Sequence, residues 1–144
     1  MTRVVVDASV ALKWFFRLQT NEHDVEQALR LLQGVFDARL TLLQPPHFVA
    51  EVSAVLARES PAIAVDSLRD LLNIEMQVID SEPVYARAIA LAAQYGHHLF
   101  DTLYHAVALE TGDTVLVTAD ARYARKARAE GCIVELANFE FDRV

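Results

Sequence analysis

The sequence predicts an α/β domain in which helices cover both faces of a parallel sheet. Short apolar segments rich in β-branched residues alternate with amphipathic helical segments, and this order is typical of parallel sheets. The first apolar segment, Val4-Val5-Val6, predicts a short strand buried on both faces. Only four glycines and four prolines interrupt the chain, and no segment has the composition of an interdomain linker.

Length and composition set the broad class of the protein. A chain of 144 residues favours a single domain, residues 1–144, and at this size about two-thirds of the unfolded surface is buried. No run of 18 apolar residues predicts a membrane span, and the N-terminus lacks the pattern of a signal peptide. The single cysteine, Cys132, excludes an internal disulfide and favours a reducing compartment. We therefore expect a cytoplasmic protein.

The net charge leaves two functional classes open. The chain carries 20 acidic and 13 basic residues, a formal charge of −7. This balance argues against a non-specific nucleic-acid binder, which should be basic. An enzyme that clusters carboxylates around divalent cations also has an acidic sequence, because its metal ions cancel part of the charge.

The spacing of apolar residues, together with capping residues and prolines, predicts the elements in the first half of the chain. A strand over residues 3–7 leads into a helix from 10 to about 17, which Ser9 can cap. Apolar residues at helical spacing predict a helix over 22–38. An extended segment over 40–43 is stopped by Pro45-Pro46, which can introduce a helix over 47–58. Pro61 separates that helix from another over 63–72.

The second half continues the alternation. Residues 76–79 predict a strand, and residues 84–95 predict a helix that stops at Gly96. A helix over 100–110 precedes the clearest later strand, Thr114 to Thr118. A helix over 120–130, ended by Gly131, and a strand over 132–136 complete the pattern. The tail, 137–144, has no strong signal.

Four carboxylates stand out by their positions: Asp7, Glu51, Asp101 and Asp120. Two of them follow predicted strands, and two lie early in predicted helices. Each has a purely structural explanation, because an aspartate can cap a helix, a first-turn acid complements the helix dipole, and a helical glutamate can be solvated.

Two details favour a shared role. Glu51 lies at the edge of the apolar face of its helix, between Phe48 and Val55. Asp7 and Asp120 both end buried-type strands, so a parallel sheet places them at the same edge. Carboxylates gathered there repel one another unless cations hold them. Oxygen ligands suit Mg²⁺ or Mn²⁺, which can activate water for in-line displacement at phosphorus.

Four segments that contain these acids resemble the PIN-domain family, most closely the VapC-type toxin ribonucleases of bacterial toxin–antitoxin pairs. In the family's order, the segments are Val5-Val6-Asp7-Ala8-Ser9-Val10, the Glu51 helix, Phe100-Asp101-Thr102-Leu103-Tyr104, and Leu116-Val117-Thr118-Ala119-Asp120-Ala121-Arg122. The resemblance implies a three-layer α/β/α fold with a five-stranded, mostly parallel sheet. It also implies a Mg²⁺ or Mn²⁺ site that cuts RNA, a homodimer, and inhibition by a small antitoxin protein.

The resemblance assigns roles residue by residue. It implies that the catalytic and metal-ligating residues are Asp7, Glu51, Asp101 and Asp120. Thr118 matches a polar residue that often precedes the last acid by two positions, and Ser9 matches a hydroxyl two residues after the first acid. One position departs from the pattern: many relatives carry Asn three residues after the helical glutamate, and this chain has Ala54.

Basic residues cluster beside the last acid. Arg122, Arg125 and Lys126 share one side of a predicted helix, and Lys13 lies on the helix after Asp7. They are either a solvated basic face or contacts for RNA phosphates. Three further groups of candidate residues, His97-His98, His105 and Tyr104, fit loop, helix-surface or packing positions better than ligand or base-stacking roles.

Other α/β enzymes fit the sequence less well. A haloacid-dehalogenase-type phosphotransferase needs a second aspartate two residues after the first, where this chain has Ser9. A receiver domain needs paired acids near its first strand, and a dinucleotide-binding fold needs glycines after it; the segment has neither. The remaining alternative is a PIN-like module that binds RNA or protein without cutting.

Overall fold

A computed structural model describes residues 2–17, 19 and 22–140 of the chain. Its centre is a five-stranded sheet in the order β3-β2-β1-β4-β5, in which every pairing is parallel. The strands are β1 (Thr2–Val6), β2 (Leu40–Gln44), β3 (Gln77–Val78), β4 (Thr114–Thr118) and β5 (Ile133–Glu135). The predicted parallel sheet is therefore confirmed.

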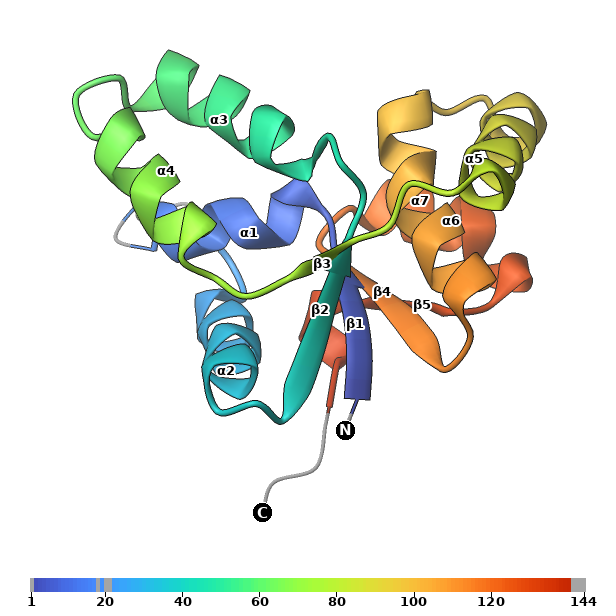
Figure 1. Ribbon diagram of the computed structural model, residues 1–144, viewed down its shortest axis with the longest axis horizontal. Coiled ribbons are helices and arrows are strands. Elements are labelled where there is room, and N and C mark those ends of the chain that lie inside the picture. The colour runs from blue at the N-terminus through green and yellow to red at the C-terminus, as the bar shows by residue number, and fades with distance from the viewer. Residues whose placement is uncertain (1, 18, 20–21, 141–144) are drawn as a thin grey trace.

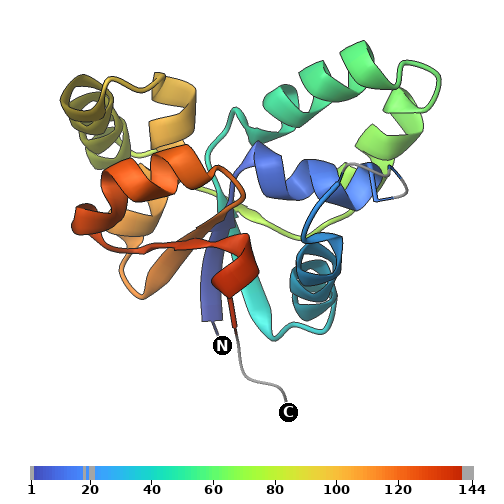
Figure 2. The same ribbon diagram turned by 180° about the vertical axis from the view of Figure 1, so that it is seen from behind.

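Helices fill the connections between strands. The α-helices of the described residues are α1 (Ala8–Phe15), α2 (Val25–Phe36), α3 (Phe48–Glu59), α4 (Ala64–Leu72), α5 (Glu82–Tyr95), α6 (Leu99–Thr111) and α7 (Ala121–Ala127). Two short 3₁₀ helices, η1 (Arg128–Glu130) and η2 (Leu136–Asn138), flank β5. Helices α1 to α4 gather on one side of the strands and α5 to α7 on the other (Figures 1 and 2). The expected three-layer α/β/α fold is confirmed.

Strand β1 lies at the middle of the core. The side chains of Val4, Val5 and Val6 have no exposed surface, because sheet neighbours lie on both sides of the strand and helices cover both faces. Helix α6 is the most buried helix, with every residue from Thr102 to Ala108 buried. It packs beside β1 and β4, so its first turn is held near the carboxyl ends of these strands.

Helix boundaries differ from prediction where the backbone takes a special conformation. The helix expected over 22–38 begins at Val25, because Asp24 has a left-handed backbone with φ of 57°. The helix expected over 120–130 ends at Ala127 and continues as the 3₁₀ turn η1. Of the tail, residues 137–138 belong to η2, and 141–144 lie outside the described residues. None of the described helices has the length and apolar character needed to cross a membrane.

Candidate functional site

Asp7 joins β1 to α1 at the carboxyl edge of the sheet. It is the N-cap of α1, and its Oδ1 accepts a hydrogen bond from the Val10 N–H at 3.3 Å. Its Oδ1 also accepts from the Ser9 hydroxyl, and its Oδ2 accepts from the Thr118 hydroxyl. Burial raises the pKa of Asp7 to about 6, although these three hydrogen bonds oppose the rise.

The two hydroxyls around Asp7 join the ends of β1 and β4. Ser9 Oγ accepts a hydrogen bond from the Ala119 N–H at 3.0 Å, and Thr118 Oγ1 accepts from the Asp120 N–H at 2.9 Å. Each hydroxyl therefore donates to the carboxylate and accepts from the backbone that follows β4. The structure thus brings both predicted supporting residues to Asp7.

Asp120 begins α7 at the same edge. Its Oδ1 accepts from the Tyr123 N–H at 3.1 Å, so it also acts as a helix N-cap. Its negative charge raises the pKa values of Asp7 and Asp101. Asp120 can therefore cap α7 and also belong to the group of acids at this edge.

Glu51 and Asp101 approach the edge from two helices. Glu51 lies in the first turn of α3, where its Oε1 accepts from the Tyr104 hydroxyl at 3.0 Å and its Oε2 lies 3.9 Å from His47 Nε2. Asp101 lies in the first turn of α6. Burial is the main cause that raises the pKa of each, and the negative charge of Asp101 adds to the shift of Glu51.

The four predicted acids form one electrostatic group. Asp7 interacts with Asp120 and Glu51, and Asp101 interacts with Glu51 and Asp120, in each case in the direction of like-charge repulsion. Partly buried acids that repel one another are a favourable environment for a cation. The set of oxygen donors fits Mg²⁺ or Mn²⁺.

The role of the four acids as metal ligands stays a prediction. Among the described residues, no three side chains of His, Cys, Asp or Glu converge closely enough to hold a metal directly. The sequence led us to expect all four carboxylates as metal ligands.

The predicted phosphate contacts divide into two kinds. Arg122 and Arg125 are exposed on α7. Lys126 Nζ lies 3.3 Å from both the Tyr95 carbonyl and His97 Nδ1, and Lys13 Nζ pairs with Glu22 at 3.0 Å. Both lysines therefore already have polar partners within the chain.

The hydrogen-bonding roles of two buried polar residues around the site were not predicted from the sequence, although a packing position was expected for Tyr104. Tyr104 is fully buried and donates its hydroxyl to Glu51, whereas Ala54, at the position of the frequent asparagine, is exposed on α3. Gln44 is also fully buried, at the end of β2 next to Asp7. Its position between a buried strand and two prolines was the only signal of a structural role.

The prediction for His105 was wrong. We expected a loop or helix-surface position, but the side chain is fully buried in α6. Its Nδ1 lies 2.8 Å from the Tyr123 hydroxyl and its Nε2 lies 2.7 Å from the Gly131 carbonyl. Because both ring nitrogens have partners, this histidine stabilises the contact between α6 and the segment from α7 to β5.

Comparisons with known proteins agree with this architecture. The sequence model of the PIN domain matches residues 4–129, whereas no curated protein matches the sequence. PAE2754 from Pyrobaculum aerophilum is 21% identical over 94% of this chain and 92% of its own, with a TM-score of 0.61.

Two further solved structures resemble the chain. A toxin–antitoxin complex from Klebsiella pneumoniae contains a chain that is 16% identical, with a TM-score of 0.65 and coverage of 96% and 99%. DNA-bound VapBC from Salmonella typhimurium contains one that is 12% identical, with a TM-score of 0.64 and coverage of 94% and 99%. At these identities, the structural likeness establishes the fold.

Proposed function

Because the chain belongs to the PIN domain family, we propose that it is a divalent-metal-dependent endoribonuclease and the toxin of a VapBC-type pair. PIN domains are generally nucleases. The observation that carries the proposal is the group of four interacting acids at the carboxyl edge of β1 and β4. Repulsion among partly buried carboxylates raises their pKa values and destabilises the fold in the absence of a cation, and carboxylates with such raised pKa values cluster at functional sites.

Each acid has a proposed role in holding Mg²⁺ or Mn²⁺. Asp7 is the central ligand, and Glu51, Asp101 and Asp120 complete the site directly or through water. When bound, the ion supplies an activated water and neutralises charge on the scissile RNA phosphodiester.

The surrounding residues fix these acids in place. The hydroxyls of Ser9 and Thr118 orient the two oxygens of Asp7. The Tyr104 hydroxyl donates a hydrogen bond to Oε1 of Glu51. The other oxygen of this carboxylate, Oε2, faces His47. Arg122, Arg125, Lys126 and Lys13 remain the proposed phosphate contacts, with the exposed arginines preferred.

The proposed partners follow from the structural neighbours. The Klebsiella and Salmonella neighbours are described as toxin–antitoxin or VapBC complexes, which supports a small antitoxin partner for this chain. Two exposed apolar side chains of α4, Val65 and Leu72, support a homodimer. We also propose that residues 1–144 form one domain, since one sheet unites strands from Thr2 to Glu135. We further propose that the protein acts in the cytoplasm.

Metal-dependent cleavage of RNA by the purified protein is the decisive test. We expect cleavage of at least one RNA in a broad panel with Mg²⁺ or Mn²⁺, none with a chelator, and none for Asp7→Asn or Asp101→Asn. Asp66→Asn is the matched control, because Asp66 is an exposed acid of α4 paired with Arg69. Calorimetric titration with Mn²⁺ adds a second readout, in which only the site variants lose binding.

The alternative function is a PIN-like module that binds RNA or protein without cutting. It would replace the nuclease if the wild-type protein, free of antitoxin, left the whole panel intact with metal present. Retained Mn²⁺ binding in Asp7→Asn would also contradict the proposed site.

A further inference from the structure

An exposed aromatic ring stands next to the acidic group. Phe100 is 49% exposed and directly precedes Asp101 in the first turn of α6. The other large apolar side chains exposed in the described residues lie on or next to α2, α4, β3 and α5. The exposed part of the ring gains free energy when a ligand covers it, and its place beside the acids makes it available to a ligand of the acidic site.

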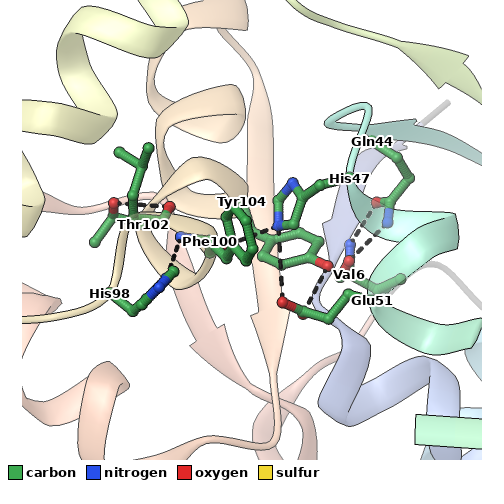
Figure 3. Close-up of polar contacts among 9 residues, drawn as sticks. Val6, Gln44, His47, Glu51, His98, Phe100, Thr102 and Tyr104 are labelled. Carbon is green, nitrogen blue, oxygen red and sulfur yellow. Dashed lines mark hydrogen bonds and ion pairs between the residues drawn. The ribbon is translucent and has the colours of Figure 1, made fainter. Parts of the chain in front are cut away.

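Two histidines hold this ring in place. The centroid of the Phe100 ring lies 5.0 Å from that of His47 and 4.7 Å from that of His98. The backbone is held as well, because the Phe100 N–H donates to His98 Nδ1 at 3.0 Å and the Phe100 carbonyl lies 2.8 Å from His47 Nε2. Figure 3 shows Phe100 between these two side chains.

The row of rings continues into the acidic site. The ring of His47 also contacts the ring of Tyr104, with centroids 4.7 Å apart, and Tyr104 is the residue that donates its hydroxyl to Glu51 (Figure 3). The row therefore begins at a proposed metal ligand and ends at an exposed ring. A flat ring fixed in this way loses little conformational entropy when another ring stacks on it.

We propose that Phe100 is a stacking platform for one unpaired base of single-stranded RNA, next to the phosphate held at the acids. The ring of His47 links the platform to the acids, because its centroid lies 5.0 Å from that of Phe100 and its Nε2 lies 3.9 Å from Glu51 Oε2. Phe100 and the acids can therefore contact the base and the phosphate of the same or neighbouring nucleotides. A base must leave its helical stack to reach the ring, which restricts the substrate to single strands and loops. This inference rests on the proposed nuclease function.

The test measures binding of a base rather than cleavage. In an Asp7→Asn background, fluorescence anisotropy gives the Kd for a short single-stranded RNA and for copies that are abasic at one position at a time. We expect one position where loss of the base weakens binding by roughly five- to one-hundred-fold. Phe100→Ala should remove this dependence, and Phe100→Trp should retain it.

Tyr85→Ala is the matched control. Tyr85 is also an exposed aromatic residue, but it lies on α5 near Arg87, which pairs with Glu110 in the last turn of α6. It is therefore at the end of α6 opposite to Asp101, and its loss should leave the abasic profile unchanged. Circular dichroism verifies that each variant is folded.

The outcomes separate the platform from the nuclease. An abasic profile that Phe100→Ala leaves unchanged overturns the platform, even if the wild-type protein cleaves RNA. A profile that depends on Phe100 supports the platform, even if the wild-type protein with Mg²⁺ cleaves nothing and the nuclease proposal fails. Absence of measurable binding to any oligonucleotide also overturns the platform. In that case, contact with a protein partner would be the remaining explanation for the exposed ring.

Discussion

The side-chain amide of Gln44 pairs with both backbone groups of Val6. Gln44 Oε1 accepts from the Val6 N–H at 2.9 Å, and its Nε2 donates to the Val6 carbonyl at 2.7 Å (Figure 3). Both residues are fully buried. The side chain therefore continues the pairing of β1 with β2 one step before Asp7, where the chain leaves the sheet.

Replacement of this amide should destabilise the fold. Gln44→Leu leaves a buried N–H and a buried carbonyl of Val6 without partners, so we expect the free energy of unfolding to fall by about 2 kcal/mol or more. Urea denaturation measures the change. Gln77→Leu is the control, because Gln77 is exposed on β3 and should change stability by less than about 0.5 kcal/mol. Equal effects of the two variants would contradict a special role for Gln44.

Loss of the Tyr104 hydroxyl should weaken metal binding more than stability. Tyr104→Phe keeps the buried ring but removes the donor to Glu51. Loss of such an outer partner typically costs about 10- to 100-fold in metal affinity or activity. Calorimetry with Mn²⁺ and RNA cleavage measure these effects. In contrast, Tyr123→Phe removes the hydroxyl that contacts His105, and should lower stability by about 1 kcal/mol without changing Mn²⁺ affinity.

Without metal, Asp7→Asn should stabilise the protein at neutral pH. The pKa of Asp7 is raised from 3.8 to about 6, so the folded state binds its proton more tightly than the unfolded state does. The contribution to stability is fully present below about pH 4, and is lost as the pH rises through 6. At pH 8 the ionised Asp7 costs about 2 to 3 kcal/mol, which the neutral asparagine avoids.

Urea denaturation in a chelator from pH 4 to pH 8 measures this difference. The advantage of Asp7→Asn over the wild type should be largest near pH 8 and should shrink toward pH 4. Asp66→Asn, on the surface of α4, should show no such trend. If Asp7→Asn were less stable than the wild type at pH 8 and gained stability relative to it toward pH 4, the direction of the Asp7 shift would be wrong.

Removal of the exposed arginines of α7 should weaken RNA binding in a salt-dependent way. We expect Arg122→Ser with Arg125→Ser to lower affinity and to reduce the slope of log affinity against log salt by about 0.7 for each arginine. Anisotropy titrations at several salt concentrations give the slope. The double variant Arg30→Ser with Arg69→Ser removes the same charge from α2 and α4, so its slope should equal that of the wild type if the contacts lie on α7.

Sequence patterns could predict the elements of this fold because they are local. Val4, Val5 and Val6 indicate a buried strand, and the alternation of strands with helices indicates parallel pairing. The parallel sheet predicted that Asp7 and Asp120 would lie at one edge, and the family resemblance implied that Glu51 and Asp101 would join them. The mutual electrostatic effects of the four acids agree with this. Their roles as metal ligands stay a prediction.

The partners of buried polar side chains could not be predicted, because they come from distant parts of the chain. Gln44 pairs with a residue 38 positions earlier, and Tyr104 with one 53 positions earlier. Helical periodicity places His105 on α6 but cannot reveal that α7 and the Gly131 turn cover it. Such pairs depend on the tertiary fold. The spacing of residues along a single sequence does not show which distant side chains will meet.

The hydrogen bond between Thr118 and Asp7 spans 111 residues of sequence, and its two strands, β1 and β4, pair directly in the sheet. Contacts of such high sequence separation form slowly, because a long loop must close before they stabilise the chain. A growing chain that ends before β4 therefore holds Asp7 without the hydroxyl of Thr118 or the charge of Asp120. During synthesis, the acidic group can therefore come together only after β4 and Asp120 have been added to the chain.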